Sequence, residues 1–130
     1  MLTEHGLGVL VDAFYSKVRK DPALGPVFEA AIAEEEWPEH LDRIRRFWSS
    51  VMLGSRSYSG DPVSIHRGIA GLERELFPRW LALFDETVRE LFEAEPAAQL
   101  TDKAHRIAGS LQLAVFHRLG GPPEGLPARR

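Results

Sequence analysis

Apolar residues recur at three- and four-residue spacing along almost the whole chain, and this periodicity constrains the fold more than any other feature. It predicts long amphipathic helices over residues 5–20 and 34–53, a third that begins between Leu72 and Pro78, and a last one over residues 100–119. Valine and isoleucine fall within these helical periods, and the alternation typical of a half-buried strand is absent from the sequence. The pattern therefore predicts an all-α fold.

The segments between these helices carry strong stop signals. Asp21-Pro22 ends the first helix, because the residue before a proline disfavours helical backbone angles. Residues 25–28, Gly-Pro-Val-Phe, indicate a turn followed by a short irregular piece. A polar loop over residues 54–61 leads into a short helix that we expect over residues 62–69.

The length of 130 residues corresponds to one domain, since domains usually span about 100–200 residues. The run Gly120-Gly121-Pro122-Pro123 ends the last helix. We therefore expect a single folded domain over residues 1–122 and a flexible tail over residues 123–130. A domain of this size supports only a modest core, so a bound cofactor could form part of it.

Composition and charge exclude several classes of function. Acidic residues outnumber basic ones 19 to 16 and no basic stripe is present, so we expect no nucleic-acid partner. No apolar run approaches the roughly 18 residues of a membrane span, and the start of the sequence lacks a signal-peptide pattern, so we expect no membrane partner and a cytoplasmic location. Cysteine is absent, which excludes disulfides, thiolate zinc sites, iron–sulfur clusters and covalently attached c-type haem.

Two histidines, His40 and His66, lie on either side of an apolar run. That run contains Ile44, Phe47, Trp48 and Val51. Tyr15 upstream adds a hydroxyl, and Trp80 downstream adds an indole N–H. One imidazole for iron, an apolar slot for the macrocycle and polar donors for a bound diatomic molecule are the requirements of a haem pocket.

Taken alone, these residues also allow plainer interpretations. His66 could be a surface-loop histidine, and Tyr15 and Trp80 could simply fill the core. A non-haem metal bundle is disfavoured, because a di-iron site needs paired Glu-x-x-His motifs and only Asp102-x-x-His105 comes close. The His-Glu-x-x-His zinc motif, the phosphate loop, the dinucleotide fingerprint and the Gly-x-Ser-x-Gly nucleophile motif are all missing.

Six fragments follow one another in a fixed order between residues 7 and 119. They are Phe14-Tyr15-Ser16-Lys17-Val18-Arg19-Lys20-Asp21, Leu24-Gly25-Pro26-Val27-Phe28, Trp37-Pro38-Glu39-His40, Phe47-Trp48, Tyr58-Ser59-Gly60-Asp61-Pro62 leading to His66, and Phe77-Pro78-Arg79-Trp80-Leu81-Ala82-Leu83-Phe84. In this order and at this spacing the fragments resemble the truncated haemoglobins of group III. The glycine pairs typical of the other truncated-globin groups are missing here, as they are in group III.

The resemblance implies a two-over-two helical sandwich around haem b. It implies that His66 is the ligand to iron, that Tyr15 hydrogen-bonds bound oxygen, and that Trp80 donates an indole N–H to the same ligand. His40 would lie near the mouth of the pocket on the same side. The further haem contacts that the resemblance implies are Phe28 on the porphyrin face, Ile44, Phe47 and Trp48 along the distal wall, and Arg43 at a propionate.

The resemblance also implies a function. Iron with five ligands would bind oxygen, nitric oxide or carbon monoxide with strong distal hydrogen bonding, which suits ligand chemistry, detoxification or sensing better than oxygen delivery. Nitric oxide dioxygenase or peroxidase-like activity would need an external reductant, and a separate reductase would supply it, because the chain has no nucleotide motif. The alternative from a different class is a haem-free all-α interaction or sensor module on a globin scaffold.

Overall fold

The computed structural model describes residues 2–58, 60, 62, 66, 69 and 71–116. Their helical elements are α1 (Glu4–Lys20), α2 (Leu24–Ala31), the 3₁₀ turn η1 (Glu34–Glu36), α3 (Trp37–Leu53), α5 (Leu76–Leu91) and α6 (Ala94–Phe116). Strands do not occur among the residues described. The all-α prediction is therefore confirmed, and the short helix expected over residues 62–69 lies mostly outside the described part.

The ends of the helices follow from their sequence. The side chain of Thr3 caps α1 by accepting a hydrogen bond of 3.0 Å from the backbone N–H of Gly6. Glycine follows the last residue of α3, and Gly54 adopts the left-handed conformation (φ 69°) that commonly ends a helix. The predicted bounds of α1 agree with the structure to within one residue. The helix predicted over residues 34–53 corresponds to the η1 turn followed by α3.

Four helices carry a proline in their first turn. These prolines are Pro26 in α2, Pro38 in α3, Pro78 in α5 and Pro96 in α6. The first turn of a helix tolerates proline, because the missing N–H has no partner inside the helix anyway. Each proline therefore helps to place the start of its helix.

The prediction that residues 25–28 form a turn and an irregular piece was wrong. They belong to α2, an eight-residue helix from Leu24 to Ala31. The two signals that suggested irregularity serve other purposes here. Pro26 lies in the first turn, where it is tolerated, and Gly25 allows close packing, since a Cβ atom at this position would lie 2.7 Å from the carbonyl oxygen of Arg19.

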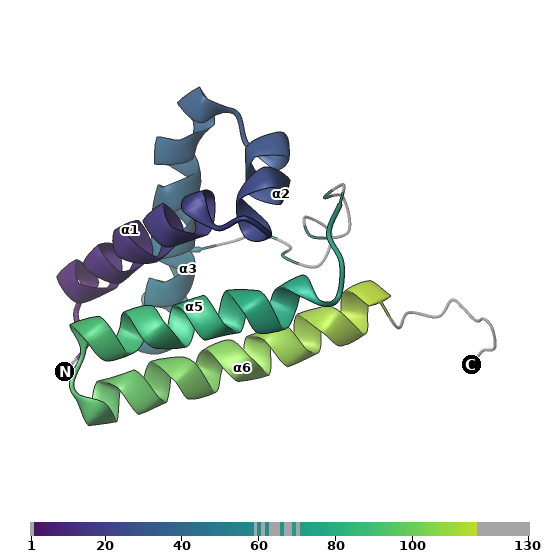
Figure 1. Cartoon of the computed structure of the whole chain (residues 1–130). Helices are drawn as coiled ribbons and strands as arrows, with labels where there is room; N and C mark the ends of the chain where they lie inside the picture. The colour runs from purple at the N-terminus through teal and green to yellow at the C-terminus, as the bar shows by residue number, and fades with distance from the viewer. Residues whose placement is uncertain are drawn as a thin grey trace.

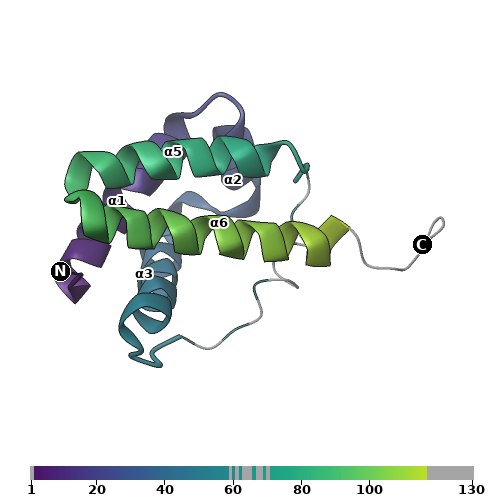
Figure 2. The ribbon, with the colours of Figure 1, turned by 90° about the horizontal axis from the view of Figure 1, so that it is seen from below.

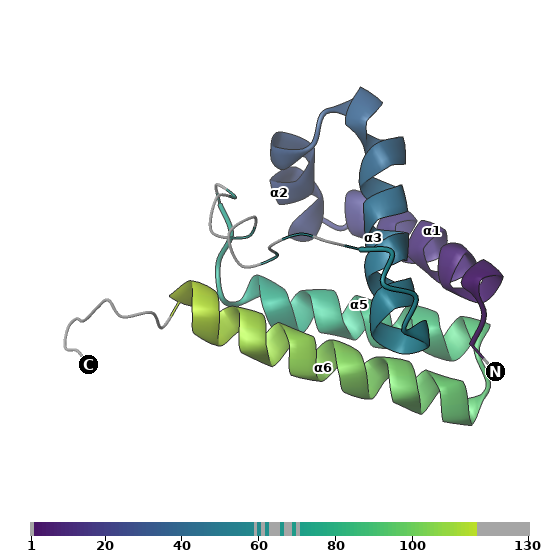
Figure 3. The same ribbon diagram turned by 180° about the vertical axis from the view of Figure 1, so that it is seen from behind.

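The helices form two layers. Helices α5 and α6 lie side by side and antiparallel, and α1 and α3 form the other layer, with α1 packed against α5 (Figure 1). Seen from below, α3 runs across the α5–α6 pair rather than along it (Figure 2). From behind, α3 stands steeply against α1 and both lie on the same side of the pair (Figure 3). This is the two-over-two helical sandwich that the sequence predicts.

The core lies where α1 meets α5 and α6. Its fully buried side chains include Leu7, Leu10, Phe14, Val18, Phe84, Val88 and Leu100. Burying each of the larger of these side chains contributes about 1.5–3 kcal/mol. Within the described part of the chain, no helix is long and apolar enough to span a membrane. Residues 117–130 are not described, so the end of the last helix and the flexible tail remain predictions.

Candidate functional site

Tyr15 and Trp80 come from different helices and meet inside the protein. Tyr15 on α1 is 7% exposed, and its hydroxyl oxygen accepts a hydrogen bond from the Trp80 indole N–H on α5. Burial raises the pKa of Tyr15 to about 12, and the hydrogen bond from Trp80 opposes this shift only partly. The phenol therefore keeps its proton at physiological pH. Among the described residues nothing accepts that proton, so the Tyr15 hydroxyl can still donate.

Aromatic rings hold this pair in place. The Trp80 ring stacks on Phe84 with centroids 5.3 Å apart, and Phe14 meets the Trp80 ring edge-on at 5.0 Å. Phe14 also meets the Tyr15 ring edge-on at 4.8 Å. Such offset and edge-to-face contacts each favour one ring orientation. Both donors are thus oriented by the core and not by solvent.

His40 lies beside this pair on α3. Its half-buried ring is 6.4 Å from the Tyr15 ring and perpendicular to it. The pKa of His40 lies below its usual value, because burial, the positive charge of Arg43 and the charge of His66 all disfavour a protonated imidazole there. The neutral form is therefore favoured at physiological pH. The structure thus places Tyr15 next to Trp80 and next to His40.

His66 has a hydrogen-bond partner that defines its tautomer. Its Nδ1 lies 2.6 Å from the carbonyl oxygen of Pro62. A carbonyl only accepts, so Nδ1 carries a hydrogen, and a neutral imidazole held in this way keeps its lone pair on Nε2, for which no described residue is a partner. A backbone carbonyl on the second nitrogen is also the usual partner of a histidine that ligates a metal. The half-buried His66 ring therefore has the form that a metal ligand requires.

The apolar face of α3 divides into two parts. Trp48 is 3% exposed and stacks on Phe84 at 5.2 Å, so it belongs to the core between the layers. Ile44 and Phe47 are only half-buried, and Phe47 meets the ring of Tyr58 edge-on at 5.3 Å. Both therefore leave part of their apolar surface uncovered, as do Leu41, Val51 and Met52 on the same helix.

The two other predicted haem contacts lie at opposite ends of the site. Phe28 on α2 packs against the rings of Tyr15, at 5.9 Å, and Trp37, at 6.3 Å. It is therefore part of the aromatic cluster. Arg43 on α3 has an exposed side chain, and its Nη1 lies 3.7 Å from a carboxylate oxygen of Glu39. An exposed ion pair at this distance contributes little free energy, so Arg43 can pair with another anion instead of Glu39.

Trp37 is a member of the cluster that the sequence analysis did not assign to the site. It is 2% exposed and lies 5.4 Å from His40 and 6.4 Å from Tyr15, ring to ring. The Arg19 guanidinium lies over its ring at 4.4 Å. Its Nε1 is buried and has no hydrogen-bond partner in the described part of the chain. The signal that could have found it is its position three residues before His40 on one helix face.

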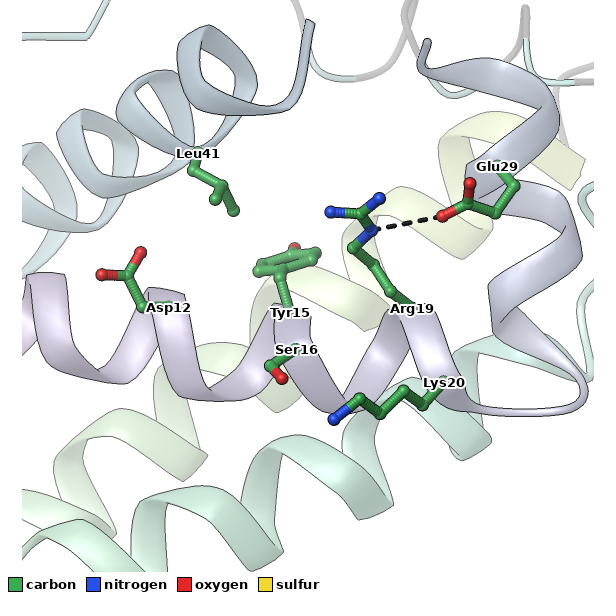
Figure 4. Close-up of a pocket in the computed structure, with 7 residues that line it drawn as sticks. All are labelled: Asp12, Tyr15, Ser16, Arg19, Lys20, Glu29 and Leu41. Atoms are coloured by element: carbon green, nitrogen blue, oxygen red, sulfur yellow. Dashed lines mark hydrogen bonds and ion pairs between the residues drawn. The ribbon is translucent and has the colours of Figure 1, made fainter. Parts of the chain in front are cut away.

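A cleft opens beside Tyr15 on the outer side of α1. It has a volume of about 510 Å³ and is lined by Asp12, Tyr15, Ser16, Arg19, Lys20, Glu29 and Leu41. Figure 4 shows the Tyr15 ring between α1 and Leu41 of α3, with Arg19 reaching across to Glu29. The lining carries both signs of charge, which does not suit a macrocycle. Elsewhere among the described residues, no group of three or more His, Asp or Glu side chains could hold a metal ion.

Comparisons with known proteins agree with this fold. A curated group 3 truncated haemoglobin of Campylobacter jejuni is 34% identical over 122 residues, which cover 92% of this chain and 95% of that protein. A crystal structure of a group III truncated haemoglobin from Campylobacter jejuni is similar with a TM-score of 0.84, over 89% of this chain and 93% of that one. No family model matches the chain.

These similarities define the class of the protein as a haem globin with a shortened helical sandwich. The chain belongs to the group III truncated haemoglobins. Membership of this family implies a haem cofactor and a small gas ligand. The resemblance seen in the sequence is therefore confirmed.

Proposed function

We propose that the chain holds haem b through Nε2 of His66 and binds a small diatomic gas on the side of Tyr15 and Trp80. The observation that carries this proposal is the hydrogen bond between His66 Nδ1 and the Pro62 carbonyl oxygen, at 2.6 Å. This bond fixes the tautomer of a neutral imidazole with its lone pair on Nε2, which is the form that haem iron takes as its axial ligand in globins.

Two further observations support the fit of a haem to these residues. Ile44 and Phe47 leave a half-buried apolar face on α3, and a porphyrin needs apolar surface of this kind. The indole N–H of Trp37 is buried without a partner in the described part of the chain, and a buried unpaired donor usually indicates a group that is not part of the chain. Arg43 on the same helix could pair with a propionate.

Haem iron, when bound, supplies a coordination position for a small gas molecule. The residues of the chain then decide how long the gas stays. Tyr15 offers an O–H inside a dry cluster, where hydrogen bonds are electrostatically stronger than in water, and the Trp80 N–H orients that hydroxyl by donating to its oxygen. Dioxygen held beside this hydroxyl would carry more negative charge than carbon monoxide, so the Tyr15 O–H would favour dioxygen.

Slow release of the bound gas suits ligand chemistry, detoxification or sensing better than oxygen delivery. Nitric oxide dioxygenation or peroxidase-like turnover would require electrons from a separate reductase. His40 lies within the same cluster and its neutral ring could accept and return a proton. We therefore assign His40 to proton transfer in such turnover, and we expect His40→Ala to slow the reaction with peroxide.

The release rate of dioxygen tests the distal assignment. The Tyr15 O–H contributes about 1 kcal/mol, so Tyr15→Phe should speed release by about fivefold in stopped-flow measurements, and Trp80→Phe, which leaves that hydroxyl unoriented, should also speed release. Phe92→Leu, which changes a ring beside Gly6 at the end of α5 and removes no donor, is the control. If the double variant Tyr15→Phe with Trp80→Phe released dioxygen at the original rate, the distal assignment would be wrong. Extraction of the pigment identifies its type, and haem b is the expected result.

A further inference from the structure

We propose that Asp21 and Arg79 are positioning residues for the gas ligand, because their ion pair holds the Trp80 indole against the Tyr15 hydroxyl. The inference rests on the proposed function, since it concerns the two donors assigned there. It adds two residues to which the sequence analysis gave no role in the site.

The Asp21 carboxylate is almost completely enclosed. Its side chain is 3% exposed, whereas the Arg79 side chain that reaches it is 50% exposed. Oδ1 accepts a hydrogen bond of 2.8 Å from Arg79 Nε and a second one from Nη2 of the same guanidinium. A guanidinium that donates through two nitrogens is fixed in direction as well as in distance.

The other carboxylate oxygen of Asp21 is used as well. Oδ2 accepts hydrogen bonds from the backbone N–H groups of Ala23, at 3.0 Å, and Leu24, at 2.9 Å. These N–H groups stand at the start of α2 and have no partner inside the helix. A single side chain thus joins the end of α1, the start of α2 and the first turn of α5.

Each of these three helices carries a residue of the aromatic cluster around Tyr15. Tyr15 lies on α1, Phe28 lies on α2, and Trp80 directly follows Arg79 on α5. The Asp21–Arg79 pair is therefore the polar link closest in sequence to the indole that donates to Tyr15. Loss of the pair would free the first turn of α5 to shift relative to α1, and the indole would shift with it.

A second set of ion pairs joins the same two helices and gives a matched control. Lys17 on α1 contacts Glu86 and Glu90 on α5, each at 2.8 Å. Both glutamate side chains are more than half exposed, and this contact lies further along α5 than Trp80. Exposed pairs of this kind contribute little to stability and do not fix a direction. Lys17→Met therefore removes an α1–α5 ion pair without releasing the indole.

The experiment uses the haem-loaded protein with dioxygen and carbon monoxide as probes. Arg79→Met removes the guanidinium, and Arg79→Lys keeps the charge but loses the paired donors. We expect Arg79→Met to speed dioxygen release by about two- to threefold, which is less than the effect of Tyr15→Phe, and Arg79→Lys to have a smaller effect in the same direction. Lys17→Met should leave the release rate unchanged. If Arg79→Met does not fold, Arg79→Lys carries the test.

A second readout separates positioning from general loss of stability. With 5-fluorotryptophan in place of the three tryptophans, the fluorine signal of Trp80 is assigned by its loss in Trp80→Phe. In the carbon monoxide complex, the Arg79 variants should shift or broaden the Trp80 signal and leave those of Trp37 and Trp48 in place. Urea unfolding of each variant confirms that the compared samples are fully folded.

Two outcomes would overturn the inference. If the Arg79 variants release dioxygen at the original rate while Trp80→Phe releases it faster, Asp21 and Arg79 do not position the indole and the proposed function stands. If Tyr15→Phe and Trp80→Phe are silent as well, the distal assignment itself fails and the positioning role falls with it.

Discussion

Helices α1 and α3 are both 17 residues long, yet they bury their side chains to very different extents. Six residues of α1 are buried, whereas only Trp37, Trp48 and Ser49 are buried on α3. Both helices carry a wide apolar face, so the difference does not come from composition. It comes from neighbours: α1 packs on α2, α3 and α5, while the main helical neighbour of α3 is α1 (Figure 3).

The comparison shows which part of the fold is complete without a cofactor. The α1–α5–α6 region fills its interior with its own side chains. The face of α3 that carries His40, Ile44 and Phe47 is left half-buried. Soluble proteins rarely leave such a face without a use. The proposed haem would cover this face, and α3 would then be as well packed as α1.

The largest expected difference in the free energy of unfolding is between truncation of an aromatic residue in the α1–α5–α6 region and truncation of one on α3. Phe84 is 1% exposed and contacts Phe14, Trp48 and Trp80, so Phe84→Ala should lower the free energy of unfolding by about 3–5 kcal/mol. Phe47 is half-buried, so Phe47→Ala should cost clearly less in the haem-free chain and should show mainly as weaker haem retention. Urea unfolding with and without haem measures both. Equal losses of stability in the haem-free chain would contradict the comparison.

Removal of haem should lower the local stability of α3 more than that of α1. A ligand at about 100 times its Kd adds about 2.7 kcal/mol to the folded state. We expect this stabilisation to appear mainly in α3, because local opening follows local packing. Hydrogen exchange of the haem-free and haem-loaded chains should show faster exchange along α3 after removal and little change along α1. Uniform loss of protection would mean that α3 is not the helix that haem completes.

The α1–α2 corner offers a prediction of intermediate size. A Cβ atom on Gly25 would lie 2.7 Å from the Arg19 carbonyl oxygen, so Gly25→Ala should destabilise the protein by about 1–3 kcal/mol. Gly109 lies inside α6 with no atom within 4 Å of the corresponding position, so Gly109→Ala should stabilise by about 0.5–1 kcal/mol. Thermal unfolding compares the two variants, and the same sign for both would show that Gly25 is not a close contact.

The smallest expected effect concerns Asp21, whose carboxylate links the end of α1 to the start of α2 and to Arg79 on α5. Arg79 lowers the pKa of Asp21 in the folded state, so the ionised carboxylate stabilises the fold above the unfolded pKa of about 3.9, and this contribution is lost as the pH falls through the folded pKa. Asp21→Asn keeps an oxygen for the N–H groups at the start of α2 but loses the ion pair with Arg79, so it should be less stable than the original chain by about 1 kcal/mol near pH 6. The gap should close below pH 4 in guanidinium titrations. A gap that stays constant down to pH 3 would show that the charge of Asp21 plays no part.

Much of the fold follows from the sequence alone. The apolar periodicity predicts α1 and α3 almost to the residue, because their stripes are long and their ends carry clear signals such as Thr3 and Gly54. Helix α2 was missed because eight residues are too few for a periodic pattern. Its start is stabilised by Asp21, which lies outside the helix. Gly25 and Pro26 alone therefore indicate a turn, whereas the hydrogen bonds from Ala23 and Leu24 to the Asp21 carboxylate favour a helix there.

The site is predictable only in part. Residue types and their order are enough to propose Tyr15, Trp80, His40 and His66 as site residues. The tautomer of His66 does not, because it depends on the orientation of one backbone carbonyl. The Asp21–Arg79 pair joins residues 58 positions apart, and the packing of the helices alone decides such a contact.

The ligand to iron is the claim that one absorption measurement tests most directly. Purified chain titrated with haem should show a sharp Soret band at one haem per chain, with a ferrous carbon monoxide spectrum typical of a histidine ligand. His66→Ala should lose this spectrum, and imidazole added to the solution should restore it. His105→Ala, which removes an exposed histidine on α6, should behave like the original chain. An unchanged Soret band and carbon monoxide spectrum in His66→Ala would contradict the account.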